Sequence, residues 1–240
     1  MFHLEHSGAF LVAFCALVVQ ASPAAVVPTV FNTGVVANDA NGKPTSVILD
    51  NEPDPHYQLV AVPTGDTDPA TPTQAIVAMQ GQFPFSGGVA VWAPDTATSK
   101  WIAPHGNENR SEGLGSGYDY RTTFDLTGFN PATAQIQGTF YADDALNGLE
   151  INGLLTSISG GTYATGTGFT ISSGFLPGIN TLDFLVVNNY APASDPSGFR
   201  VEMTAMASTP EPTGLVVAIG LCGMGLTGRR RLAGKSGTRP

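Results

Sequence analysis

The chain has 240 residues and carries 19 acidic residues against 10 basic ones, a formal net charge of −9 at pH 7. Half of the basic residues follow residue 228, so residues 25–208 hold 17 acids against 5 bases, a charge of −12. A domain this acidic excludes nucleic acid as a partner, because the phosphate backbone requires a cationic surface. The length predicts one domain of ordinary size plus processing segments.

The first 24 residues are expected to form the helix of a signal peptide. Residues 9–19 are an apolar run too short to span a bilayer, which is typical of the central region of such a peptide. Small residues at Ala21 and Ala24 provide two candidate cleavage sites. The only other cysteine besides Cys15 is Cys222. The span between them therefore has no disulfide, thiolate metal site or cysteine nucleophile.

Residues 25–208 are predicted to be a single all-β domain. Gly and Pro recur every eight to twelve residues, and the segments between them are rich in Val, Ile, Thr, Phe and Tyr. Because Gly and Pro recur so often, no uninterrupted segment shows the apolar spacing of an amphipathic helix. The expected strands are 46–49, 57–62, 74–79, 89–92, 118–126, 133–142, 149–152, 168–171, 180–188 and 198–207.

Two of these segments alternate between a mostly apolar face and a polar face, and Thr122 is the one polar residue on the apolar face of the first. In the first, Tyr118, Tyr120 and Phe124 fall on one face while Asp119 and Arg121 fall on the other. In the second, residues 199, 201, 203 and 205 are apolar and residues 200, 202 and 204 are polar. Strands with one buried and one solvated face are typical of antiparallel sandwiches. We therefore expect an antiparallel β-sandwich of the jelly-roll type.

The last 32 residues form three segments in a fixed order. Thr209-Pro210-Glu211-Pro212 cannot be helix or inner strand. Residues 213–228 are apolar or small throughout and are expected to form a single transmembrane helix of about 24 Å, shorter than the usual hydrocarbon core. Arg229, Arg230 and Arg231 then supply a cationic stop that favours the cytoplasmic side.

This order resembles the sorting tail of the PEP-CTERM proteins of Gram-negative bacteria. The resemblance covers Pro210, Glu211 and Pro212, the helix, and the Arg229–Arg231 cluster. It implies an exported protein that is held in the inner membrane by its tail and processed by an exosortase, a membrane-bound protease or transpeptidase. It also implies a final location at the cell surface or in the extracellular matrix. The Gly-rich, short helix and the nine residues after the cluster depart from the family pattern.

A second, looser resemblance covers residues 118–205. Tyr120-Arg121, Asp143-Asp144, Ile151-Asn152-Gly153 and the turn of residues 177–180 follow one another in the order seen in galactose-binding-like β-sandwiches. Together with the segments at 54–57 and 99–102, the chain is also similar to the extracellular module that PEP-CTERM proteins carry. The resemblance implies a jelly-roll topology.

No catalytic motif is present, so the candidate site residues are chosen by chemistry alone. The chain lacks the G-x-S-x-G, H-E-x-x-H and P-loop patterns. Trp101, Arg121 and Arg200 are the candidate ligand-binding residues. A flat indole can stack on a sugar ring, and both arginines are expected on solvated strand faces. Each arginine can equally pair with a neighbouring Asp. Trp92 is interpreted as a core residue.

Oxygen-rich turns suggest one structural ion. Asp143 and Asp144 are the expected ligands of a structural Ca²⁺, although no EF-hand consensus is present. No other cofactor is expected.

The leading hypothesis is an exported, non-catalytic surface or matrix protein with exopolysaccharide as its ligand. Two alternatives stay open: a polysaccharide-processing enzyme that uses paired carboxylates, and a purely structural domain without a ligand.

Overall fold

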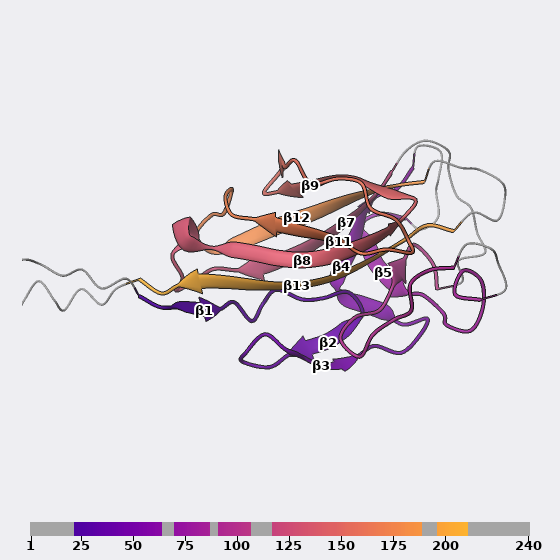
Figure 1. Cartoon of the computed structure of the whole chain (residues 1–240), viewed down its shortest axis with the longest axis horizontal. Coiled ribbons are helices and arrows are strands. Elements are labelled where there is room, and N and C mark those ends of the chain that lie inside the picture. The colour runs from indigo at the N-terminus through magenta and orange to yellow at the C-terminus, as the bar shows by residue number, and fades with distance from the viewer. Residues whose placement is uncertain (1–21, 64–69, 87–90, 107–116, 189–195, 211–240) are drawn as a thin grey trace, which may run out of the picture.

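The computed structural model describes residues 22–63, 70–86, 91–106, 117–188 and 196–210, and these residues form an all-β protein (Figure 1). The expected all-β class is confirmed, and the only helical element in this part of the chain is the single 3-10 turn Pro131–Thr133. The strands are β1 (Ala24–Val26), β2 (Val35–Asn38), β3 (Pro44–Val47), β4 (Pro53–Ala61), β5 (Thr73–Val77), β6 (Ile102–Ala103), β7 (Gly117–Asp125), β8 (Gln135–Asp143), β9 (Ala145–Ile151), β10 (Leu154–Leu155), β11 (Thr167–Ile171), β12 (Ile179–Val187) and β13 (Gly198–Ser208).

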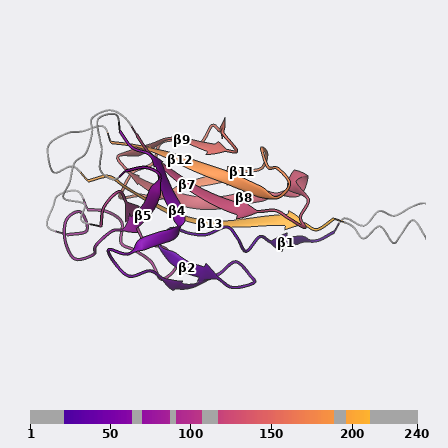
Figure 2. The same ribbon diagram turned by 180° about the vertical axis from the view of Figure 1, so that it is seen from behind.

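Eleven of the strands form one antiparallel sheet that curls into two facing layers. The sheet order is β10-β9-β12-β7-β4-β5-β6-β13-β8-β11, and β1 pairs with β13. We call β10-β9-β12-β7-β4 the β7 layer and β1-β13-β8-β11 the β13 layer. The short strands β5 and β6 connect the layers along one side, while β2 and β3 form a separate hairpin. The arrangement is consistent with the expected β-sandwich, and Figure 2 shows it from behind.

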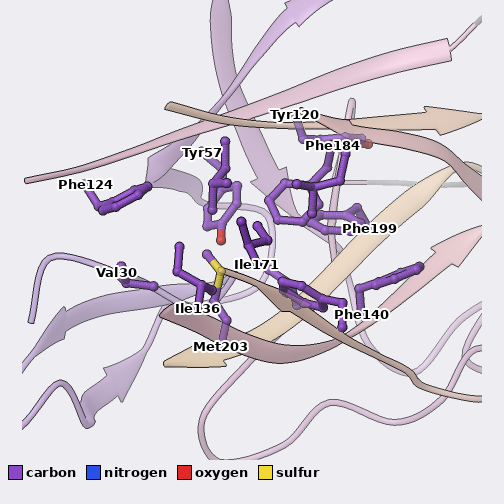
Figure 3. Packing of buried hydrophobic residues seen from close by; sticks show 14 of the residues in the cluster. Val30, Tyr57, Tyr120, Phe124, Ile136, Phe140, Ile171, Phe184, Phe199 and Met203 are labelled. Carbon is purple, nitrogen blue, oxygen red and sulfur yellow. The ribbon is translucent and has the colours of Figure 1, made fainter. Parts of the chain in front are cut away.

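Aromatic side chains from the two layers meet in the core. The rings of Phe184 on β12 and Phe199 on β13 have centroids 4.5 Å apart, and Tyr120 on β7 lies 5.7 Å from Phe199. Phe169 on β11 contacts Phe184 edge to face. Figure 3 shows the rings of Tyr120, Phe184 and Phe199 together with Phe140 and the aliphatic residues around them. Burial of this continuous apolar surface is the main force that holds the layers face to face.

The alternation predicted for the two long strands is observed. In β7 the aromatic residues Tyr118, Tyr120 and Phe124 are buried, and Asp119 and Arg121 lie on the outer face. In β13 the apolar positions 199, 201, 203 and 205 are buried as expected. The period of two therefore identified the core face of both strands.

Strand prediction failed for short segments. Residues Val91 and Trp92 are not in a strand, and the remainder of the expected strand 89–92 lies outside the described residues. The strands β1, β2, β6 and β10 were not expected. They have two to four residues each, which is too few for an alternation of apolar and polar residues to be recognised.

The first and last described strands lie side by side. Ala24 pairs with Ser208 and Val26 with Met206, so β1 begins where β13 ends (Figure 1). Ile179 at the start of β12 pairs with Asp125 at the end of β7, and Asn130, just after β7, donates its backbone N–H to the Ser208 carbonyl. These residues therefore belong to one end of the sandwich, which we call the β1–β13 end.

Most of the two expected terminal segments lies outside the described residues. This applies to the signal helix up to residue 21, to Glu211 and Pro212, to the expected transmembrane helix 213–228 and to Arg229–Arg231. Pro210 is the last described residue and is exposed. Within the part of the chain that the structure describes, we find no helix with the length and apolar character needed to cross a membrane.

Candidate functional site

Trp101 is a core residue and does not present a surface for stacking. Its side chain is fully buried, its ring stacks on Trp92 with centroids 4.1 Å apart, and its Nε1 donates to the Ala93 carbonyl. The proposed role of Trp101 as an accessible sugar platform is therefore wrong. The interpretation of Trp92 as a core residue is confirmed, since Phe85 and Trp101 both pack against it.

Arg200 was expected on the solvated face of its strand, and this expectation is also wrong. The side chain is 2% exposed, its guanidinium lies 4.1 Å from the centre of the Tyr141 ring, and it donates to the Pro94 carbonyl. The reason is tertiary: the segment around Pro94 and Trp101 covers the outer face of β13 and β8 at this position. The stacked cation is structural and holds this covering segment in place.

Asp143 and Asp144, the expected calcium ligands, lie where β8 meets β9. Asp143 is buried, and its Oδ2 accepts a hydrogen bond of 2.7 Å from Trp92 Nε1. No group of three or more His, Cys, Asp or Glu side chains arranged to hold a metal ion occurs among the described residues. The Trp92 contact gives Asp143 a structural role, and calcium binding at this pair stays a prediction.

Arg121 lies on the outer face of the β7 layer and pairs with Asp183. Its Nε and Nη2 donate to the two carboxylate oxygens of Asp183 at 2.5 and 3.1 Å, a bidentate arrangement. The Arg121 side chain is 41% exposed, whereas Asp183 is almost fully buried. The sequence alternative that this arginine pairs with a neighbouring Asp is thus the observed one. The pairing raises the pKa of Arg121.

Arg121 belongs to a row of polar side chains that crosses four strands. Gln58 on β4 is opposite Arg121 on β7, which is opposite Asp183 on β12, which is opposite Glu150 on β9. Asp119 lies two residues before Arg121 on the same face. Burial, together with the charges of Asp183 and Glu150, raises the pKa of Asp119 to about 6, although Arg121 lowers it. The row therefore contains more negative than positive charge.

A cleft of about 320 Å³ opens beside this row, between β4, β7 and the segment that follows β1. Its lining combines an aromatic wall with uncharged and charged polar groups: Thr29, Phe31, Pro55, His56, Gln58, Arg121, Thr123, Phe124, Asp125 and Ile179. The Phe31 and His56 rings are parallel at 3.6 Å and form the aromatic wall. Burial lowers the pKa of His56 and so favours the uncharged imidazole in this wall.

A buried carboxyl group fixes the wall of the cleft. Asp54 precedes His56 on β4 and is fully buried; its Oδ2 accepts from the Gly34 N–H at 2.6 Å and its Oδ1 from the His56 N–H at 2.8 Å. Tyr57 donates its hydroxyl to the Phe31 carbonyl. These bonds tie the segment that carries Phe31 to the strand that carries His56. Burial raises the pKa of Asp54 to about 7 despite the backbone donors.

The cleft has the chemistry of a binding site for a neutral polyhydroxyl ligand. Gln58, Arg121 and Thr123 present hydrogen-bonding groups, and the Phe31–His56 wall is flat and apolar. The positive charge of Arg121 is compensated by Asp183, so an anionic ligand gains little there. Among the described residues that line the cleft, Asp125 alone carries a carboxyl group, and its Oδ1 accepts from the Thr127 N–H.

Of the three candidate ligand-binding residues, the structure brings only Arg121 to an accessible site. The residues that complete the cleft, Phe31, His56 and Gln58, were not selected from the sequence. His56 lies in β4, and its Nε2 is 3.0 Å from the Val36 carbonyl oxygen. The available signal was the aromatic and polar alternation at residues 56–58, which marks an outer strand face.

Comparison with known proteins returned no relative. No family model, no curated protein and no solved structure matches this chain. The description that the fold and the site support is an all-β protein of antiparallel, sandwich-like architecture, with a cleft on one outer face that combines an aromatic wall with hydrogen-bonding groups.

Replacement of Arg121 by Met should lower the free energy of unfolding by about 1–3 kcal/mol, because the buried Asp183 loses its charged donor. In the double variant Arg121→Met/Asp183→Asn the loss should be smaller than the sum of the two single losses, by about 0.5–3 kcal/mol. Urea unfolding of all four proteins measures this coupling. Additive single losses would contradict a stabilising pair.

Stability should fall as the pH rises from about 5 to about 8. A carboxyl group whose pKa is higher in the folded than in the unfolded chain stabilises the fold at low pH and loses this contribution as the pH passes the folded value. Asp54, at about 7, and Asp119, at about 6, both behave in this way. The urea midpoint should therefore be higher at pH 5, and Asp119→Asn should reduce the difference.

Asp39 provides the matched control for this titration. Backbone N–H groups of Lys43 and Asn41 lower its pKa, so it is ionised at both pH values in the folded and in the unfolded chain. Asp39→Asn should leave the difference between the two midpoints unchanged. Equal midpoints at pH 5 and pH 8 in the unsubstituted protein would contradict the assignment of Asp54 and Asp119.

Proposed function

We propose that this chain is an exported, non-catalytic cell-surface or matrix protein of the PEP-CTERM type, sorted by an exosortase, whose sandwich binds exopolysaccharide. The observation that carries the proposal is the order of segments after the last strand. β13 ends at Ser208, and the sequence continues at once with Pro210-Glu211-Pro212, the apolar residues 213–228 and Arg229–Arg231. This order suits a segment that enters a membrane and stops there.

The pairing of the first strand with the last supports this proposal. Because Ala24 pairs with Ser208, the expected signal peptide and the expected tail are joined to the domain at the same end. A domain attached in this way can be held at a membrane through its tail while its strands remain fully paired. In the proposal the tail is held in the inner membrane only until the exosortase acts, after which the domain reaches the surface.

We further propose that the sandwich is a jelly roll of the galactose-binding-like type. We number eight strands in chain order from first to eighth: β1, β7, β8, β9, β10, β11, β12 and β13. In this numbering the β13 layer, β1-β13-β8-β11, has the order first, eighth, third, sixth. The β7 layer correspondingly reads second, seventh, fourth, fifth. This interleaving is the pattern of two Greek keys wound together in a jelly roll.

The cleft beside Arg121 is the proposed exopolysaccharide site. A polysaccharide offers many hydroxyl groups and apolar ring faces, which the hydrogen-bonding groups of Gln58 and Thr123 and the flat Phe31–His56 wall complement. The non-catalytic assignment rests on the cleft lining, in which Asp125 faces no second carboxyl group among the described residues. Two carboxyl groups about 5–9 Å apart across the ligand are what glycoside hydrolysis requires.

Processing should occur at both ends of the chain. Because β1 begins at Ala24, cleavage after Ala21 leaves the Ala24–Ser208 pair intact, and Ser22 is the expected first residue of the mature protein. The intact mass of the native protein should be lower than that of the full 24.8 kDa chain by the combined mass of the signal peptide and the tail segment. Glu211→Gln should leave the tail attached if the motif is read. A native mass equal to the full chain would overturn the proposal.

Binding of the producer's own exopolysaccharide should depend on Gln58. Loss of one or two hydrogen bonds in Gln58→Ala should weaken retention on the immobilised polymer by about three- to tenfold. Gln137→Ala is the matched control, since Gln137 is an exposed glutamine on the opposite layer. Equal retention of both variants would exclude the cleft, and no retention of the unsubstituted protein would favour the purely structural alternative.

A further inference from the structure

Four large apolar side chains are exposed at the β1–β13 end of the sandwich. Leu154 and Leu155 on β10 are 63% and 67% exposed, Leu176 in the loop before β12 is 52% exposed, and Ile179 at the start of β12 is 64% exposed. We call these four residues the apolar end patch. Single exposed leucines are ordinary on protein surfaces, but several at one end mark a surface that contacts another apolar phase.

Hydrogen bonds hold the two parts of the patch together. Asn152 lies in the turn between β9 and β10, and its Nδ2 donates to the Gly174 carbonyl at 2.9 Å and to Asn180 Oδ1 at 2.8 Å. Asn180 Oδ1 also accepts from the Leu176 N–H at 2.8 Å. The turn that carries Leu154 is thus fixed to the loop that carries Leu176. These hydrogen bonds therefore fix the backbone on which the exposed side chains are carried.

A groove of about 390 Å³ runs along the same turn and loop. Its lining alternates aliphatic side chains with small hydroxyl residues: Ile151, Leu154, Leu155, Thr156, Ser157, Ile158, Thr170, Ile171, Ser172, Ser173 and Gly174. None of the described residues that line the groove is charged. Such a surface can enter the boundary between headgroups and acyl chains without burying a charge.

The length of chain between this end and the expected membrane segment is short. From Ser208 at the end of β13, only residues 209–212 precede the apolar stretch that starts at residue 213. Four residues span at most about 14 Å when fully extended. If residues 213–228 enter a bilayer, the β1–β13 end must lie within that reach of its surface.

We propose that the apolar end patch docks on the lipid surface next to the point where the tail enters the membrane. This inference rests on the proposed function of the tail and adds a second, weaker contact to it. Apolar residues provide the contact, and residues 25–208 carry a charge of −12, so docking does not depend on anionic lipid or on low salt. Ile179 also lines the cleft, so the docked end and the cleft are neighbours.

The test uses the whole chain, with Cys15→Ser and Cys222→Ser, reconstituted through its tail into phosphatidylcholine vesicles that contain a lipid-attached fluorescence quencher. Single cysteines at Leu155, Leu176 and Leu49 carry an environment-sensitive dye in separate samples. Leu49 is the matched control, because it is 75% exposed and lies away from the patch. Two residues after it, Asn51 donates its backbone N–H to the Val77 carbonyl at the end of β5. We expect several-fold stronger quenching at Leu155 and Leu176 than at Leu49, unchanged in high salt.

A second pair of variants separates docking from folding. Leu154→Asp should abolish the quenching at Leu176 while leaving the urea midpoint in detergent unchanged, and Leu49→Asp should affect neither. Docking would be overturned if quenching at Leu155 and Leu176 were no stronger than at Leu49. It would also be overturned if the dye at Leu155 reported an apolar environment in the absence of lipid, because that would indicate a protein partner.

Failure of the proposed tail is recognised independently. A dye at residue 219, within the apolar stretch, reports insertion of the tail. If that dye is quenched and the dye at Leu155 is not, docking alone is wrong. If the dye at residue 219 is not quenched and the chain does not float with the vesicles, the tail assignment and the docking inference fall together.

Discussion

The pairing of β13 with strands on both of its sides is the constraint on which the rest of the structure depends. β13 pairs with β8 over nine positions, from Gly198 to Met206, and with β6 and β1 along its other edge. Through β6 and β5 it connects the two layers, and through Phe199 it contributes the ring that meets Phe184 and Tyr120 across the core. One strand thus fixes both the hydrogen-bonded frame and the apolar interior.

The fold could be predicted where a long strand alternates, and the site could not. In β7 and β13 the period of two distinguishes the core face from the outer face without reference to any partner. Arg200 obeys that period and is still buried, because a segment about a hundred residues earlier covers it. Trp101 belongs to that covering segment and is itself buried, with its ring stacked on Trp92. Cover by a distant segment leaves no trace in local sequence.

The cleft illustrates a different limit of sequence reasoning. Arg121 was identified because its strand alternates, but its partner Asp183 lies on another strand, 62 residues later, and the register between them is a property of the sheet. Phe31 is held beside the same cleft by two bonds to β4: Asp54 accepts from the Gly34 N–H, and the Tyr57 hydroxyl donates to the Phe31 carbonyl. The electrostatic character of the cleft therefore follows from tertiary pairing, in particular from the neutralisation of Arg121.

The place of β13 in the chain has a consequence for the order of folding. Val27 and Thr33, near the start of the described residues, donate backbone hydrogen bonds to the carbonyls of Ala205 and Val201. These bonds cannot form until β13 has been synthesised. A chain that emerges N-terminus first holds β1 and β8 without their shared partner until residues 198–208 have appeared. Contacts of such long sequence separation form slowly. The sheet can therefore close only after β13 has been synthesised.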